Sequence, residues 1–253
     1  MKISVGNLNM TYPKGKKALQ DISIQIESPG LIGILGPEGA GKSTFIKLLI
    51  GELLPTSGQI LVDDVPLSKM EKKLKPNLGY LPQSFGLYDE LTVWQFLDYI
   101  AALKGIKNSR KVIKEVIQKT NLMEKQKAYM STLSAQERQR AGIAQALMGS
   151  PELLIFDEPT AGLGLEERIN FRNLLSQTAQ EKLVLLSTHI IEDVESLCDK
   201  LIVIKQGQIL FNGTSEQLID LAYNDAIVFK EHNVKPTFED AYMYLLMGKE
   251  VVK

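Results

Sequence analysis

The chain has 253 residues, 44% of them hydrophobic, which is enough to bury one substantial core. Twenty-nine basic and thirty acidic residues leave a formal net charge of −1, which argues against a general attraction to nucleic acid or anionic lipid. The single cysteine, Cys198, cannot form an internal disulfide and is expected to be a small buried residue in a reducing compartment. No secretory leader pattern and no apolar run near the ~20 residues that span a bilayer are found, so we expect a soluble chain.

The first elements predict a β-rich start, followed by a strand, a loop and a helix. Residues 22–26 alternate between isoleucine and polar side chains, as a half-buried antiparallel strand does. Residues 31–35 are typical of a strand buried on both faces. After a glycine-rich turn, apolar residues recur at helical spacing from Phe45 to Leu49, and Gly51 lies beyond the expected helix end.

The pattern changes to helices alone from about Leu91 to Gly149, with apolar faces over 94–101 and 112–117. Strand patterns return at 153–156, 183–187 and 201–204, separated by helical stretches, which predicts a largely parallel sheet.

The last part of the chain predicts a hairpin and a short helix. The hairpin spans 202–211 and turns near Gln206 and Gly207, and Thr237 is a plausible cap for the terminal helix. We expect the polar residues 223–225 to form the most flexible connection.

Residues 36–43, Gly-Pro-Glu-Gly-Ala-Gly-Lys-Ser, match the P-loop pattern in full and lie between a predicted strand and a predicted helix. The glycines let backbone N–H groups close around phosphate oxygens, and the helix N-terminus adds positive potential. Lys42 is expected to reach the β- and γ-phosphates and Ser43 to ligate Mg²⁺. The expected nucleotide-binding residues are Gly36, Pro37, Glu38, Gly39, Ala40, Gly41, Lys42, Ser43 and Thr44.

Two carboxylates follow the predicted strand at 153–156, at the edge where open α/β sheets place their ligands. We expect Asp157 to contribute to the coordination sphere of Mg²⁺. Glu158 is placed to orient and deprotonate the water that attacks the γ-phosphate. The alternative is a pair of solvated charges at a strand end, which the P-loop upstream makes less favourable.

Many P-loop proteins share these two elements, but the residues around them resemble ABC ATPases along nearly the whole chain. Tyr12 stands where that family has an aromatic residue that stacks on adenine, although it can also be read as an exposed loop tyrosine. Gln83 resembles the family's glutamine that senses Mg²⁺ and the γ-phosphate. His189 matches the histidine that contacts the γ-phosphate. The resemblance therefore implies ATP and Mg²⁺ as cofactors, catalytic roles for Glu158, His189 and Lys42, and metal contacts from Ser43, Gln83 and Asp157.

Residues 133–140 stand where the family has its signature helix, but Ala135 and Gln136 replace the two glycines that usually follow the serine. In the family this segment contacts ATP held by a second subunit, so Ser134, Ala135 and Gln136 are expected to face the partner's nucleotide. Gln136 can crowd that phosphate unless its side chain turns aside. Ser134 and Glu137 keep capping-box spacing, so the helix start is expected to survive.

Two further positions depart from the family pattern. Glu38 replaces a common asparagine in the P-loop, and Gly164 replaces a common aspartate. In the family dimer these positions approach each other across the interface, so we hypothesise that Gly164 relieves a repulsion that Glu38 would create. This favours a homodimer, and the rival is a heterodimer in which the partner has an intact signature.

The resemblance implies a single ABC ATPase domain over 1–253. Its nucleotide-binding core is expected at 1–86 and 150–222, an inserted helical lobe at 87–149 and a C-terminal extension at 223–253. The implied fold class is α/β: a P-loop NTPase core of mostly parallel sheet, an N-terminal antiparallel β subdomain and the helical lobe.

The function that follows is an ATP-hydrolysing subunit that powers a membrane transporter by closing as a dimer around two ATP. The permease is expected on a separate chain, and the sequence of residues 83–93 resembles that of exporter ATPases. Phe85, Leu87 and Tyr88 are candidate permease contacts, or equally lobe core. We expect no nucleic-acid partner and a cytoplasmic location, peripheral on the inner face of the membrane through the permease. The alternative is a soluble ABC ATPase of an assembly or regulatory system without a permease.

Overall fold

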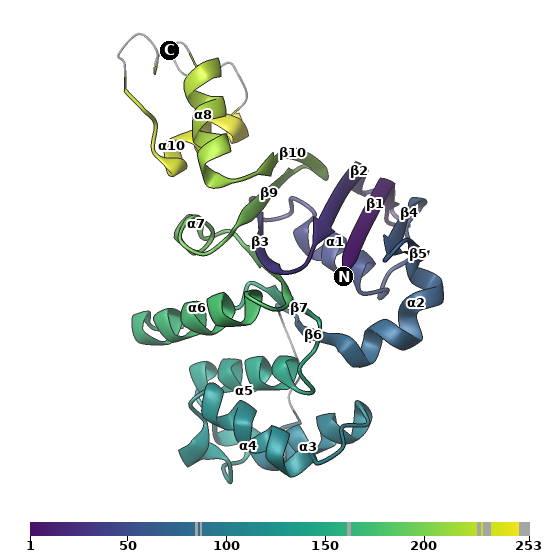
Figure 1. Cartoon of the computed structure of the whole chain (residues 1–253), viewed down its shortest axis with the longest axis vertical. Coiled ribbons are helices and arrows are strands. Elements are labelled where there is room, and N and C mark those ends of the chain that lie inside the picture. Colours follow the sequence, from purple (N-terminus) through teal and green to yellow (C-terminus); the bar gives the residue numbers. More distant parts are fainter. Residues whose placement is uncertain (84–85, 87, 161–162, 227–228, 230–233, 248–253) are drawn as a thin grey trace.

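In the computed structural model the chain forms two β-sheets, a helical lobe and a pair of C-terminal helices (Figure 1). The structure describes all residues except 84–85, 87, 161–162, 227–228, 230–233 and 248–253. The predicted α/β fold, with its antiparallel N-terminal sheet, its mostly parallel sheet and its inserted helices, is confirmed.

The N-terminal sheet has the strand order β2-β1-β4-β5 and is antiparallel throughout. Its strands are β1 (Lys2–Thr11), β2 (Lys17–Glu27), β4 (Ser57–Val62) and β5 (Val65–Pro66). In β2 the isoleucines at 22, 24 and 26 are buried and the residues between them are exposed, so this predicted half-buried strand is confirmed.

The second sheet has the order β10-β9-β3-β8-β7-β6, and only its edge pair β9–β10 is antiparallel. Its strands are β3 (Gly30–Leu35), β6 (Leu78–Leu81), β7 (Leu153–Asp157), β8 (Leu183–Thr188), β9 (Lys200–Lys205) and β10 (Gln208–Gly213). Strands β7 and β8 are buried along their whole length, as helices on both faces of a parallel sheet require. Strands β9 and β10 form the predicted hairpin around Gln206 and Gly207.

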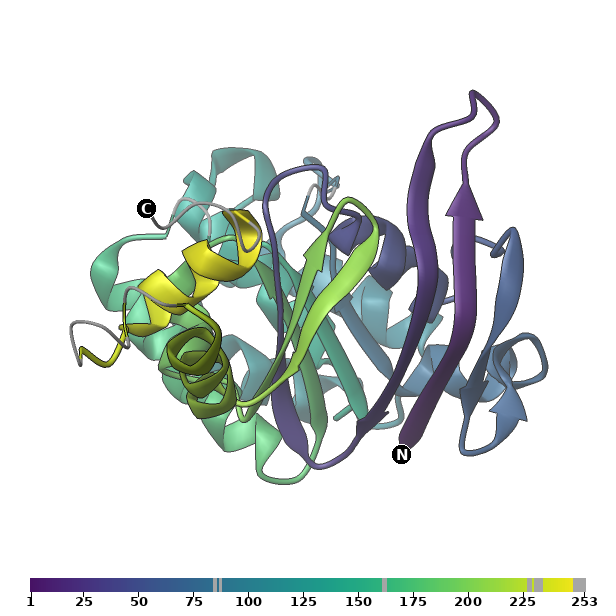
Figure 2. The ribbon, with the colours of Figure 1, turned by 90° about the horizontal axis from the view of Figure 1, so that it is seen from above.

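Helices cover both faces of the parallel sheet. Helix α1 (Lys42–Leu49) lies between the two sheets (Figure 2), where its buried Phe45 joins the core that includes Ile24 of β2 and Ile34 of β3. It ends as predicted, because Gly51 adopts a φ of 74° one residue past the cap. On the opposite face, α6 (Leu165–Ala179) packs Phe171 against Phe156 of β7, with ring centroids 5.3 Å apart. The short helix α7 (Ile191–Glu195) follows β8.

The helical lobe lies between β6 and β7 in sequence and has a core of its own. It contains α3 (Val93–Leu103), α4 (Ser109–Lys119), α5 (Ala135–Leu147) and the short 3₁₀ turns Met123–Lys125 and Met130–Thr132. Helix α2 (Leu67–Leu74) and the 3₁₀ turn Lys75–Asn77 precede β6. The lobe occupies one end of the molecule, far from the C-terminal helices (Figure 1).

The C-terminal helices α8 (Ser215–Asp225) and α10 (Phe238–Met247) pack against β9 and α7. Residues 223–225 are the last turn of α8, so the expected flexible connection there is wrong: Leu218 and Ala222 are fully buried and hold the helix down. The capping role of Thr237 is confirmed, since the Asp240 N–H donates to its hydroxyl at 3.1 Å.

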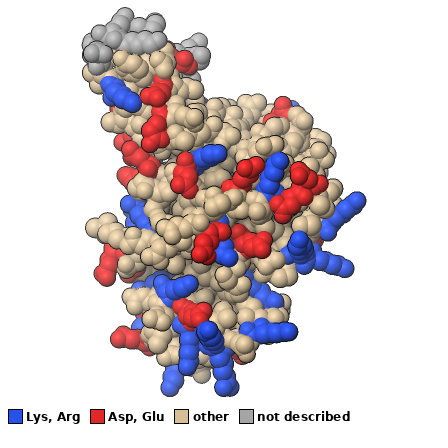
Figure 3. Space-filling view, in the orientation of Figure 1, with Lys and Arg blue, Asp and Glu red and all other residues tan. Residues whose placement is uncertain are grey.

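The charges are distributed unevenly over the surface despite the small net charge. Figure 3 shows Lys and Arg side chains gathered at the end formed by the helical lobe, where Lys107, Arg110, Lys111 and Lys114 are exposed. Cys198 is partly buried, with its sulfur beside Gly33, and burial raises the pKa of its thiol. Among the described residues, no helix is both long enough and apolar enough to cross a bilayer.

Candidate nucleotide site

Three parallel strands deliver the predicted site residues to one edge of the sheet. Strands β3, β7 and β8 run in the same direction and end at Leu35, Asp157 and Thr188. The P-loop, Glu158 and His189 each come directly after one of these ends. This is the edge at which open α/β sheets bind ligands.

The glycines of the P-loop are required by its path. A Cβ at Gly36 would lie 2.1 Å from the carbonyl oxygen of Ile204, and one at Gly41 would lie 2.6 Å from that of Ala18. Gly39 and Gly41 also have positive φ values of 73° and 112°. The loop then leads into α1, whose first N–H groups have no partner within the helix and receive no hydrogen bond from the N-cap side chain, so they are available to an anion.

The hairpin turn between β9 and β10 supports this loop from a distant part of the sequence. The Gly207 N–H donates to the carbonyl of Ala40 at 2.8 Å, and the Gln20 N–H donates to the carbonyl of Gly207 at 2.8 Å. The P-loop is therefore held between β2 and the hairpin, a contact that the sequence pattern did not predict.

Lys42 and Glu158 form a buried ion pair at the centre of the site. Their side chains are each 7% exposed, and the Lys42 Nζ lies 3.5 Å from Glu158 Oε1. The same ammonium donates to the carbonyls of Gly36 at 2.7 Å and Pro37 at 3.3 Å. All of its close partners are therefore oxygens, arranged around the mouth of the loop.

His189 holds the other oxygen of the same carboxylate. Its Nδ1 lies 2.8 Å from Glu158 Oε2, and its backbone N–H donates to that oxygen at 3.4 Å. The Glu158 N–H donates to the carbonyl of Ser187 at 2.8 Å, and Glu158 has a φ of 53°, a conformation that few non-glycine residues adopt. Glu158 thus stands between a cation and a half-exposed imidazole.

Asp157 and Ser43 offer oxygen atoms that suit a hard divalent cation. Asp157 is 2% exposed, and its Oδ1 has no hydrogen-bond partner among the described residues. Burial raises the pKa of Asp157, and a hydrogen bond from Ser43 opposes that shift. A buried carboxylate oxygen without a partner, beside a hydroxyl, fits the ligand preference of Mg²⁺.

A cavity of about 340 Å³ opens beside these residues, within the range of small-molecule sites. It is lined by residues 38–44, Tyr12, Lys16, Ala18, Gln83 and Glu158. The Tyr12 hydroxyl lies 3.2 Å from Thr44 Oγ1, which places the tyrosine at the rim of the cavity. Lys16 could not be predicted as a lining residue from the sequence, because no motif surrounds it.

The signature residues lie apart from this cavity. Ser134 caps α5 through the predicted capping box, with Glu137 N–H donating to its hydroxyl at 3.2 Å and its own N–H donating to Glu137 Oε2 at 2.8 Å. The Gln136 side chain turns toward Gly164: its Nε2 lies 3.5 Å from the point where a Cβ on Gly164 would stand. The Gln136 side chain therefore lies against another segment of its own chain.

Two contacts near Glu158 were also missed. The Gln139 side chain donates from α5 to the carbonyl of Pro159 at 2.7 Å. Asp193, which is fully buried, accepts from Thr160 and Arg172. These residues are far apart in sequence and carry no motif, so only the fold brings them together.

Comparison with known proteins identifies the family. The sequence profile of the ABC transporter family matches residues 19–161. The ABC transporter ATP-binding protein NatA of Bacillus subtilis is 36% identical over 81% of this chain and 85% of its own length. The linearmycin resistance ATP-binding protein LnrL of the same organism is 33% identical over 88% of this chain and 72% of its own length. The chain spans only 61% of an uncharacterized ABC transporter ATP-binding protein from Nostoc.

Solved structures agree on the fold. The ATP binding subunit of an ABC transporter aligns with a TM-score of 0.84 over 97% of this chain and all of its own, at 23% identity. The dimeric structure of MJ0796, a bacterial ABC transporter cassette, aligns with a TM-score of 0.78 over 84% of this chain and 98% of its own, at 24% identity. The family match and the curated relatives together show that this chain belongs to the ABC transporter ATP-binding proteins and is an ATPase.

Proposed function

We propose that this ATPase powers a membrane transporter whose permease is a separate polypeptide, and that it sits on the inner face of the membrane through that permease. The observation that carries the catalytic part is the Lys42–Glu158–His189 cluster beside the P-loop. Family membership supports the transport part. We further propose one domain over 1–253, with the core at 1–86 and 150–222, the lobe at 87–149 and an extension at 223–253.

In this proposal the P-loop and Lys42 bind the phosphates of ATP. Backbone N–H groups at the start of α1 and the Lys42 ammonium face the position of the anion. Tyr12, at the rim of the cavity, takes the adenine side, and Gln83 lies in the same lining. Glu38 is exposed on that lining and adds a negative charge near the nucleotide.

Glu158 is the proposed general base. Its carboxylate takes a proton from water while the water oxygen attacks the γ-phosphorus and the bond to the bridging oxygen breaks, which yields ADP and phosphate. His189 holds one carboxylate oxygen through Nδ1, which fixes the orientation of Glu158 and leaves Nε2 free to face the phosphate.

Ser43, Gln83 and Asp157 would hold Mg²⁺, which neutralises charge on the phosphate oxygens when bound. Asp157 keeps an unpaired oxygen in a buried position, and Ser43 presents its hydroxyl beside it. The residues contribute the orientation of these oxygens and exclude bulk water from them.

The signature residues support a dimer. Because Ser134, Ala135 and Gln136 lie away from the cavity of their own chain, they are available to the ATP of a second subunit. The neighbouring side chains Leu165 and Ile169 are 76% and 49% exposed, an apolar surface that a second subunit would cover. We propose a homodimer, since each copy carries both Glu38 and Gly164.

Light scattering after gel filtration tests this assembly. The Glu158→Gln variant with ATP should form a dimer of this chain alone, because slowed hydrolysis traps the closed state. The Lys42→Ala, Glu158→Gln double variant should stay monomeric. A Glu158→Gln variant that stays monomeric with bound ATP would support the heterodimer.

The proposed permease surface is an exposed hydrophobic strip, defined here as Tyr88, Tyr99 and Leu103. These side chains are 44%, 41% and 66% exposed, and the rings of Tyr88 and Tyr99 meet edge to face with centroids 5.2 Å apart. The other two candidate contacts, Phe85 and Leu87, lie outside the described residues. Adjoining apolar side chains that are exposed to water are typical of a protein interface. The exposure of Tyr88 therefore favours a permease contact over core packing.

The transporter proposal predicts that this chain copurifies with a multi-spanning membrane protein, which affinity purification from solubilised membranes tests. Leu103→Glu should abolish copurification, whereas Leu54→Glu, at a 78% exposed position on the core, should leave it intact. If no membrane protein copurifies with the unaltered chain, the soluble assembly or regulatory function is favoured instead.

Export is the proposed direction. The chain is 34% identical to a Nod factor export ATP-binding protein of Rhizobium etli over 86% of its length, and similar to the linearmycin resistance protein. Two relatives named as methionine import proteins are 36% and 30% identical, so the direction needs a test. ATP-driven uptake into inverted membrane vesicles would support export, and uptake into right-side-out vesicles would contradict it.

A further inference from the structure

Asp193 is the most completely buried carboxylate among the described residues, and none of the chemistry proposed above uses it. Its relative exposure is 0%, and it lies on α7, four residues after His189. A carboxylate in such a position needs partners, because burial of an unpaired charge costs several kcal/mol. Its partners therefore report what it holds together.

Asp193 Oδ2 accepts from the hydroxyl of Thr160 at 2.6 Å. Thr160 is 3% exposed and lies two residues after Glu158, at the root of the segment that leads to Gly164 and α6. This hydrogen bond joins the chain that carries the proposed base to the helix that follows the proposed histidine.

Asp193 Oδ1 accepts twice from Arg172 of α6, from Nη2 at 2.6 Å and from Nε at 3.1 Å. The Arg172 side chain is 26% exposed, so the pair is partly shielded from water. Asp193 thus ties three elements to one point: the segment after β7, helix α6 and helix α7.

The Glu158 and His189 segments are also joined directly, through the carboxylate–imidazole contact at 2.8 Å. That contact involves two side chains that must adjust when water and phosphate bind. The Thr160–Asp193 bond is buried and does not involve either reacting group. It is suited to keep the two segments in fixed register while the contact between Glu158 and His189 changes.

We propose that Asp193 is a positioning residue for ATP hydrolysis, which acts through Thr160 and Arg172 to hold Glu158 opposite His189. This rests on the proposed function in that Glu158 is taken as the general base. Asp193 itself does not touch the nucleotide, so its loss should lower kcat and leave the binding of ATP unchanged.

Thr160→Val is the sharpest test, because it keeps the shape of the side chain, removes one hydroxyl and leaves the Asp193–Arg172 pair intact. We expect kcat for ATP hydrolysis by the full chain to fall at least about ten-fold, with KM within about two-fold, as misplacement of a general base predicts. Thr160→Ser, which restores the hydroxyl, should recover the rate.

Thr120→Val is the matched control. Thr120 is 5% exposed, and its hydroxyl donates to the carbonyl of Val116 at 2.8 Å in the lobe, so the variant also loses one buried hydrogen bond. Its kcat should match that of the unaltered chain. Equal kcat values for Thr160→Val and Thr120→Val would overturn the proposal, whether both are normal or both are low.

Glu158→Gln separates this proposal from the one on which it rests. If Glu158→Gln hydrolyses ATP at the normal rate, the assignment of the general base fails. If Glu158→Gln is inactive and Thr160→Val is fully active, only the role of Asp193 fails. Asp193→Asn is the second variant: it leaves Arg172 without its counter-charge, and its kcat should fall at least as far as that of Thr160→Val.

Discussion

Gly164 is a glycine that the backbone does not require, since its φ of −69° is open to any residue. A Cβ there would instead meet side chains of the same chain, Glu167 Oε2 at 2.7 Å and Gln136 Nε2 at 3.5 Å. The room left by the missing side chain is therefore used by the altered signature as well as by any relief of Glu38 across a dimer. The two departures from the family pattern are linked within one subunit.

Gly164→Asp should lower the ATPase rate, because the new carboxylate meets Glu167 in its own chain and, in the proposed homodimer, Glu38 of the partner subunit. Gly164→Asn has the same size without the charge and should keep more activity. Steady-state phosphate release measures both variants. Unchanged or higher activity in Gly164→Asp would count against this account.

Glu38→Asn should tighten nucleotide binding. Glu38 is exposed on the lining of the cavity, where its charge opposes the phosphates through water, so removal should lower the Kd for Mg-ATP by roughly two- to five-fold. Titration calorimetry at low and high salt measures the change. The control is Glu124→Gln, which removes an exposed carboxylate in the helical lobe. Binding no tighter than in the unaltered chain would refute the prediction.

At the scale of residues, the sequence predicts what lies in one contiguous motif. The P-loop and the Asp157–Glu158 pair could be read because short stretches of chain dictate their chemistry. The Thr160–Asp193 bond could not, because it joins residues 33 positions apart that only the packing of α7 on β8 brings together. The direction of the Gln136 side chain likewise depends on Gly164, which belongs to another element.

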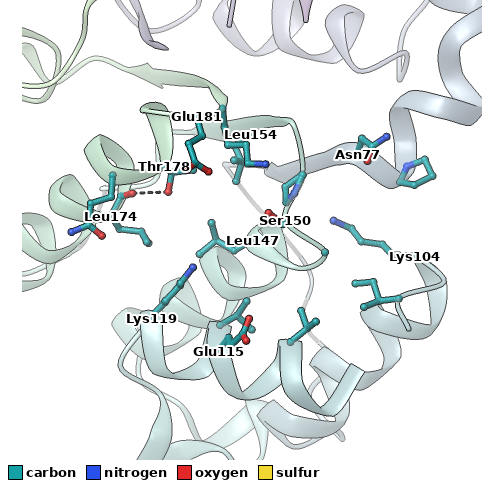
Figure 4. A pocket seen from close by; sticks show the side chains of 18 of the residues that line it. Asn77, Lys104, Glu115, Lys119, Leu147, Ser150, Leu154, Leu174, Thr178 and Glu181 are labelled. Carbon is teal, nitrogen blue, oxygen red and sulfur yellow. Dashed lines mark hydrogen bonds between the residues drawn. The ribbon is translucent and has the colours of Figure 1, made fainter. Parts of the chain in front are cut away.

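At the scale of elements, Lys104 joins the helical lobe to the core. It caps α3, and its ammonium donates to the carbonyls of Leu78 in β6 and Met148 after α5, each at 3.0 Å. Figure 4 shows it beside a cavity of about 610 Å³ at the junction of lobe and core. The other charged residues that line this cavity are Glu115, Lys119, Glu181 and Lys182.

Burial lowers the pKa of Lys104 from 10.5 to about 8. Between these pH values the unfolded chain holds a proton that the folded chain has lost, so the free energy of unfolding should rise with pH through this window. Relative to Lys104→Met, the gain should be no more than about 3 kcal/mol. Urea unfolding of both proteins from pH 7 to pH 10.5 measures it, and a difference that is flat or falls with pH would contradict the shift.

Helix and strand types could be predicted where the apolar period is clear, as in β2, β3 and α1. The prediction failed at residues 223–225, where local polarity favours a loop but Leu218 and Ala222 anchor α8 from the preceding turns. The contact between the P-loop and the β9–β10 turn also could not be predicted from the sequence, because Ala40 and Gly207 are 167 positions apart and neither has a polar side chain.

At the scale of the whole molecule, the antiparallel sheet, the parallel sheet and the β9–β10 hairpin meet around the P-loop, where Lys42 pairs with Glu158. The central claim is that this convergence makes an ATP-hydrolysing site with Glu158 as its base. The most direct measurement is phosphate release by Glu158→Gln together with calorimetry of its Mg-ATP binding. The account predicts a rate at least about 100-fold lower with binding retained. An unchanged rate, or no binding of Mg-ATP by the unaltered chain, would contradict it.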